Sequence, residues 1–141
     1  MLTTSETTLV PDVATDPNLN NMVFASLARP WTDNGNPSVK QMNDVIAQCA
    51  PSLSNVGHAH VGWTSAKLLE YASTFFPANP TITSKDILAA MDKVKNYDVG
   101  GMTGPLTFTA GKSAPQVRCY WTMKVSNGKF TTPVGTARKC I

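Results

Sequence analysis

The sequence predicts an α/β fold, and three observations carry that prediction. Between residues 37 and 95, three segments place apolar side chains at helical spacing. Residues 118–125 alternate apolar and polar side chains like a half-buried strand, and Asn127-Gly128 follows as a hairpin turn. The helices carry enough apolar surface to cover a sheet, but few strands are visible. We therefore expect part of an α/β protein rather than a complete one.

The chain is expected to begin with a lead-in and one strand. Residues 1–21 are polar and turn-rich without periodicity, which indicates a loop or an extended segment. Residues 22–28 form a short apolar run that ends at Arg29-Pro30. That length and those boundaries are typical of a mostly buried strand.

The first helix is predicted for residues 37–49. Asn36 can accept a backbone hydrogen bond as N-cap, Pro37 suits the first helical position, and Pro51 ends the helix. Its apolar face consists of Val39, Met42, Val45, Ile46 and Cys49.

Two further helices follow. Residues 61–76 predict one that ends before Pro77. The other, over residues 83–95, starts with a capping box between Thr83 and Asp86. The apolar stripe of the earlier helix contains Trp63, Ala66, Leu68, Leu69, Ala72, Phe75 and Phe76. In the later helix we expect a buried stripe of Ile87, Leu88, Met91 and Val94.

The C-terminal part is organised around the alternating strand. Gly100-Gly101 permits a turn after the third helix, and in residues 118–125 every second side chain is apolar. Beyond the hairpin turn, Pro133 and Gly135 indicate an irregular tail. The residues expected on one face of the strand are Cys119, Trp121, Met123 and Val125.

Composition excludes several classes of protein. With 141 residues, 42% of them hydrophobic and 15% charged, the chain fits one globular domain and not a disordered tail. No apolar run is long enough to span a bilayer, and residues 1–6 lack the features of a signal peptide. Six basic residues follow Asp98 without an acidic one, but they are scattered, so we expect no nucleic-acid partner.

Three cysteines stand at positions 49, 119 and 140 without C-x-x-C spacing. Two segments that fold back around the Asn127-Gly128 turn can bring Cys119 and Cys140 together. A disulfide between them is one interpretation, and it indicates an oxidising compartment. The alternative is three free thiols. If the disulfide forms, Cys49 is the odd residue, either in the core or paired outside the chain.

The sequence offers no catalytic motif, so we expect neither an enzyme nor a cofactor. Gly111-Lys112-Ser113 has the end of a P-loop, but Leu106 stands where the first glycine belongs. Gly100-Gly101 follows a helix, whereas the dinucleotide fingerprint follows a strand. No G-x-S-x-G elbow surrounds a serine.

His58 and His60 are the candidate binding residues. With Cys49 they form C-x8-H-x-H, which matches no standard metal site, so no metal is expected. In an extended segment the two histidines share one face, and one of them can donate a hydrogen bond to a ligand. The alternative is a pair of ordinary, partly exposed histidines.

The order of these features resembles the C-terminal part of type I periplasmic solute-binding proteins, the branched-chain amino acid receptors of ABC importers. An apolar strand ending near a proline precedes a proline-started helix, a helix with Trp63 near its start, and a helix opened by Thr83. Residues 104–108 (GPLTF) and the turn at residues 127–129 (NGK) complete the set. The match covers residues 19–130.

The resemblance implies a periplasmic-binding-protein-like type I fold, of which the chain forms the C-terminal portion. Such proteins are two-lobed clamps that close on a small solute, with hinge strands crossing between the lobes. Residues 1–30 are then a lead-in and hinge strand, residues 31–117 a helical lobe segment with three flanking helices, and residues 118–141 a crossing strand, hairpin and tail. The parent protein is expected to be extracytoplasmic, at the periplasm or cell surface.

The resemblance also implies the solute-binding component of an ABC importer for amino acids, amides or related solutes. Its partners are the solute, the transporter permease and a missing N-terminal lobe. The loop before the second helix borders the family's cleft, which places a ligand contact at His58 or His60, with Trp63 nearby. Because the main carboxylate- and ammonium-binding positions lie in the other half, the chain alone is expected to bind no solute usefully.

Two other classes of protein stay open. One is a ligand-sensing regulator with the same clamp, which would lack exported disulfides. The other is a small α/β interaction domain that self-associates through exposed strands.

A histidine stands in the loop where amino-acid-binding members of the resembled family often have an aromatic residue. This difference argues against an aliphatic amino acid as the ligand.

Overall fold

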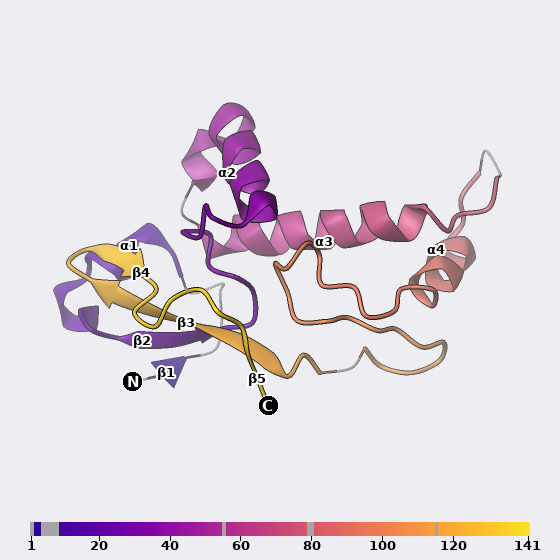
Figure 1. Ribbon diagram of the computed structural model, residues 1–141. Helices are drawn as coiled ribbons and strands as arrows, with labels where there is room; N and C mark the ends of the chain where they lie inside the picture. The colour runs from indigo at the N-terminus through magenta and orange to yellow at the C-terminus, as the bar shows by residue number, and fades with distance from the viewer. Residues whose placement is uncertain (1, 4–8, 55, 79–80, 115) are drawn as a thin grey trace.

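The computed structural model describes residues 2–3, 9–54, 56–78, 81–114 and 116–141. Figure 1 shows a twisted sheet at one end of the molecule, with helix α2 (Pro37–Cys49) above it. Helix α3 (Gly57–Ser73) runs from near the sheet to the opposite end, where helix α4 (Ser84–Met91) packs against it. The fold is α/β, as the sequence predicts. Within the described ranges, no helix has the length and apolar character needed to cross a membrane.

The sheet combines one parallel pair with antiparallel pairs. Strand β1 runs parallel to β2, β2 and β4 flank β3 in antiparallel register, and β5 pairs with the first two residues of β3. Ser26 lies opposite Trp121, so the end of β2 meets the start of β3. The strands are β1 (Leu2–Thr3), β2 (Val23–Ser26), β3 (Cys119–Ser126), β4 (Lys129–Thr131) and β5 (Lys139–Cys140).

Strand β3 and its hairpin confirm the predictions made for them. Cys119, Trp121, Met123 and Val125 are buried, and the residues between them are partly exposed. Asn127 and Gly128 both have positive φ, 51° and 75°, as a two-residue turn of the primed type requires. The hairpin twist therefore matches the strands it joins.

Helix α2 has the predicted bounds, but only part of its predicted face is buried. The Asn36 side chain accepts hydrogen bonds from the backbone N–H groups of Ser38 and Val39, at 2.9 and 3.0 Å. Its later turns rise away from the sheet (Figure 1). Of the predicted apolar face, Val39 and Met42 are consequently buried, whereas Val45 and Cys49 are exposed.

The two chain ends contain more regular structure than predicted. Strand β1, the short helix α1 (Pro11–Thr15) and a 3-10 turn (Pro17–Leu19) lie where a loop or extended lead-in was expected, and β5 lies in the tail expected to be irregular. These elements span two to five residues, which is too short to show a period. Residues 1 and 4–8 of the lead-in lie outside the described residues.

Helix α3 begins at Gly57, four residues before the predicted start at residue 61. Its buried residues include His60 and Ala72, whereas Ala66 and Leu69 of the predicted apolar stripe are exposed. The helix packs against the main core near its start and against α4 at its end, so the middle of its predicted stripe remains uncovered.

Helix α4 confirms the predicted capping box, but it ends earlier than predicted. The Thr83 hydroxyl accepts from the Asp86 backbone N–H, and the Asp86 carboxylate accepts from the Thr83 backbone N–H. The helix ends at Met91 instead of residue 95. Leu88, predicted to be buried, is 69% exposed, because α4 turns its Ala90 side toward α3.

Two hydrophobic clusters hold the described residues together. Tyr97 packs against both of them. The main cluster joins the sheet to α2 and contains Leu9, Phe24, Trp31, Val39, Met42, Val99, Met102, Met123 and Val125. The small cluster joins α3 to α4 and contains Ala72, Ala90 and Val94. The division into residues 1–30, 31–117 and 118–141 stays a prediction.

Candidate functional site

The start of α3 carries the binding residues predicted from the sequence. Its N-cap residue, Val56, has no polar side chain, so no side-chain hydrogen bond caps the helix there. The Gly57 N–H instead donates to the Leu9 carbonyl at 3.0 Å. This bond fixes the first turn of α3 beside the segment that follows β1. The N-terminal end of α3 therefore presents the positive end of its helix dipole near that segment.

The structure separates the two candidate histidines. Both lie on α3, where residues two positions apart point to different sides of the helix. His58 is exposed, whereas only 1% of His60 is exposed. The segment is helical, so the condition under which the two histidines would share one face is not met. Of the two, His58 is the one placed to meet a molecule arriving from solvent.

Trp63 lies one turn further along α3. Its ring is partly buried against the main cluster, and the Lys67 ammonium stands 6.0 Å from the ring centroid. The indole N–H is buried, and no residue that the structure describes accepts a hydrogen bond from it. Trp63 consequently anchors the start of α3 to the core and contributes mainly an apolar surface.

A hollow that the sequence did not reveal lies between α1, the loop after β2 and the β3–β4 hairpin. Its volume is about 360 Å³. Trp31 and Phe130 meet edge to face in its wall, with ring centroids 5.4 Å apart. The other residues lining it are Pro11, Ala14, Thr15, Thr32, Gly128 and Lys129. The lining is mainly apolar, which suits a small apolar group.

A second hollow, of about 210 Å³, lies beside α3 and contains two tyrosines. The rings of Tyr71 and Tyr97 stack with centroids 3.9 Å apart. Burial raises the pKa of Tyr97, so its hydroxyl stays protonated at neutral pH. Lys67 and Glu70 form an ion pair at its edge, with 2.5 Å between Nζ and Oε2. This arrangement offers hydrogen-bond donors at the edge of the hollow.

Arg29 connects the segments predicted to cross between lobes. Its Nε donates to the Gly101 carbonyl at 2.8 Å, and its Nη1 lies 2.6 Å from Oδ2 of Asp33. The guanidinium stands 5.7 Å from the centroid of the Trp121 ring on β3. Arg29 thereby joins the end of β2, the glycine turn and the start of β3. Whether these strands cross between lobes stays a prediction.

The structure brings Cys119 and Cys140 together in a disulfide, as one of the two interpretations of the sequence predicts. The third cysteine, Cys49, is exposed at the end of α2. In the part of the chain that the structure describes, no cluster of three His, Cys, Asp or Glu side chains is arranged to hold a metal ion.

The architecture is a partial periplasmic-binding-protein-like type I fold. A solved structure that carries this finding is the leucine-binding protein LivK from Thermotoga maritima, with a TM-score of 0.64 and 13% sequence identity. The match covers 97% of this chain and 36% of that chain. At this identity the likeness shows the fold alone. No family model and no curated protein sequence matches the chain.

Proposed function

We propose that the chain is part of the solute-binding component of an ABC importer for amino acids or related small solutes. The observation that carries the proposal is the fold, which follows LivK over 97% of the chain. LivK is a leucine-binding protein, which supports an amino acid or a similar small molecule as the solute class. The chain spans 36% of the length of LivK, so the proposed clamp needs a further lobe.

In this proposal the start of α3 borders the solute. His58 is exposed in the first turn and offers an imidazole hydrogen bond, and the partly exposed Trp63, five residues further along the helix, supplies an apolar surface. The positive end of the helix dipole favours a carboxylate group there. His60 supports the site from the interior, because it is almost fully buried.

The proposal also names a location and partners. The Cys119–Cys140 disulfide supports an extracytoplasmic parent protein, because such bonds persist in oxidising compartments. The partners are the preceding lobe, which closes the clamp, and the transporter permease that receives the loaded receptor.

The test compares two polypeptides by isothermal titration calorimetry. One is the 141-residue chain, and the other extends it by the coding sequence directly upstream of Met1, which we expect to encode the first lobe. Against a panel of amino acids and amides, only the longer polypeptide should bind with micromolar affinity. Within it, His58→Ala should weaken binding about 10-fold, since one hydrogen bond to a charged group is lost.

A matched control is Ser73→Ala, which replaces an exposed residue at the other end of the same helix. This substitution should leave the affinity for the solute unchanged. Micromolar binding by the 141-residue chain alone would contradict the proposal. So would an upstream sequence that does not encode the first lobe.

A further inference from the structure

The last six residues run back across the start of β3, and we propose that they form a redox-operated strap. The strap is defined as residues 136–141. The disulfide between Cys119 and Cys140 locks it, and reduction by a dithiol releases it while the rest of the fold stays intact. This inference concerns the tail alone and does not depend on the proposed transport function.

Covalent and backbone bonds fix the outer end of the strap. Cys140 pairs with Cys119 and Lys139 with Tyr120 in the short β3–β5 ladder. The Ile141 N–H donates to the Arg118 carbonyl at 2.9 Å. The disulfide thus links two residues that already face each other across the ladder.

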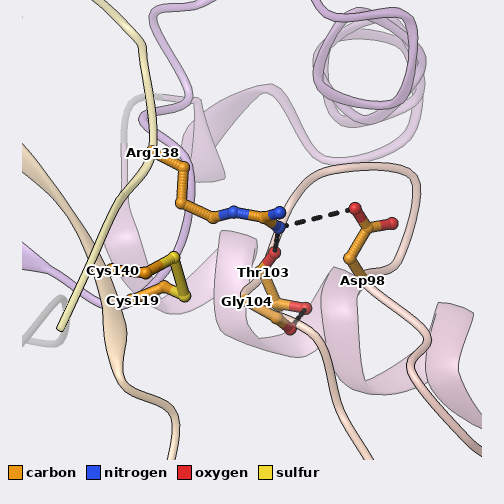
Figure 2. Close-up of a disulfide and its surroundings, with 6 residues drawn as sticks. All are labelled: Asp98, Thr103, Gly104, Cys119, Arg138 and Cys140. Atoms are coloured by element: carbon orange, nitrogen blue, oxygen red, sulfur yellow. Dashed lines mark hydrogen bonds and ion pairs between the residues drawn. A yellow bond between two sulfur atoms is a disulfide. The ribbon is translucent and has the colours of Figure 1, made fainter.

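The strap also holds the turn at residues 98–104, as Figure 2 shows. Nη1 of Arg138 donates to the Thr103 carbonyl at 3.1 Å and lies 3.5 Å from Oδ2 of Asp98. On its other side, the same turn accepts a hydrogen bond from the Arg29 N–H through the Met102 carbonyl, at 2.8 Å. The turn at residues 98–104 is therefore held from two sides, by the strap through Arg138 and by the segment after β2 through Arg29.

At its inner end the strap reaches Trp121. The indole Nε1 donates to the Thr136 carbonyl at 3.1 Å, and the Trp121 side chain is fully buried. Removal of the strap takes away this hydrogen-bond acceptor. Release of the tail therefore changes the surroundings of a core tryptophan.

The noncovalent contacts of the strap are weak enough for the disulfide to decide its position. Residues 137–141 are all exposed, so they bury little apolar surface. The Arg138–Asp98 pair is partly exposed and long, and exposed ion pairs contribute little. A ladder of two residue pairs at the end of a chain frays readily.

Because Cys140 is exposed and Cys119 is buried, the reductant attacks the Cys140 sulfur. A thiolate of the dithiol attacks the Cys140 sulfur, forms a mixed disulfide with it, and breaks the bond to Cys119. The Cys119 sulfur leaves as a thiolate and takes up a proton. The second thiol of the reductant then attacks the mixed disulfide and frees Cys140. Two electrons pass to the protein, and the dithiol becomes a cyclic disulfide.

Limited trypsin digestion followed by mass spectrometry tests the strap. The protein carries Cys49→Ser, so the exposed free thiol cannot exchange. In the oxidised protein, cleavage after Arg138 should be slow, because the side chain and the backbone around it are held. Treatment with dithiothreitol, or the double change Cys119→Ser and Cys140→Ser, should accelerate that cleavage at least about 10-fold. Cleavage after Lys112, in an exposed loop, is the internal control and should not change.

Hydrogen exchange of the β2 and β3 amides distinguishes a disulfide that holds only the strap from one that stabilises the whole sheet. We expect those amides to stay protected after reduction while the amides of residues 139–141 exchange. An unchanged cleavage rate after Arg138 would overturn the proposal. Loss of protection across β2 and β3 in parallel with cleavage would overturn it too, because the disulfide would then support the entire sheet.

Discussion

At the scale of single residues, Gly104 occupies a tightly packed position against the disulfide-bearing end of β3. A Cβ atom added there would lie 2.7 Å from Cγ1 of Val117 and 3.0 Å from Cβ of Cys119. Contacts this short force the neighbouring segments apart. Gly104 therefore allows the turn at residues 98–104 to approach β3 closely enough for the strap to bind both.

We expect Gly104→Ala to destabilise the protein by about 1–3 kcal/mol, the range of overpacking in a filled interior. Urea unfolding followed by circular dichroism measures the change. The control is Gly62→Ala on α3, where an added Cβ meets nothing within 4 Å. That change should stabilise the helix by about 0.5–1 kcal/mol, since alanine is the better helix former. Equal midpoints for Gly104→Ala and the unaltered protein would contradict the packing argument.

The arrangement of the histidines also depends on single positions. His58 and His60 were recognisable as candidate binding residues from the sequence, but their directions depend on whether the backbone around them is extended or helical. The backbone is helical because α3 starts at Gly57. The wall formed by Trp31 and Phe130 could not be recognised, because nothing in the local sequence reports a contact across almost a hundred residues.

At the scale of elements, local signals decide which boundaries are predictable. Helices α2 and α4 start where Asn36 and Thr83 supply a capping side chain, and both starts were predicted. Helix α3 has Val56 as N-cap, and its first turn is fixed by the carbonyl of the distant Leu9. Because this start depends on a tertiary contact and has no local sequence pattern, the predicted start is four residues too late.

The capping box of α4 makes this helix sensitive to acid. The hydroxyl and backbone N–H of Thr83 donate to the Asp86 carboxylate and, with a smaller effect of Lys85, hold its pKa below the usual 3.8. A group whose folded pKa is lowered stabilises the fold above its unfolded pKa. That contribution is lost as the pH falls below 3.8 through the lowered value.

We therefore expect the amides of α4 to lose protection from hydrogen exchange in acid before those of β3. Asp86→Asn should remove this pH dependence, and Thr83→Ala should cost about 1 kcal/mol at neutral pH. NMR titration of the Asp86 carboxyl and of the α4 amides measures both effects. The neighbouring change Ser84→Ala is the control and should leave the titration in place. An Asp86 carboxyl that titrates at or above 3.8 would refute this account.

At the scale of the whole molecule, the two hydrophobic clusters stabilise different parts of the fold. The main cluster holds the sheet and α2, and the small cluster holds only the far ends of α3 and α4. Tyr97 bridges them, since it packs against both and its ring stacks on Tyr71. A chain with one strong and one weak cluster is expected to open locally at the weak one first.

Val125 and Val94 allow a matched test of this division, because both are fully buried valines, one in each cluster. Truncation to alanine removes two methyl-sized groups and should cost about 2 kcal/mol at either site. For Val125→Ala we expect faster exchange of every slowly exchanging amide, because the main cluster sets global stability. For Val94→Ala we expect faster exchange only in α4 and the last turns of α3. Native-state hydrogen exchange measures both patterns, and uniform acceleration by Val94→Ala would show that the two clusters unfold as one.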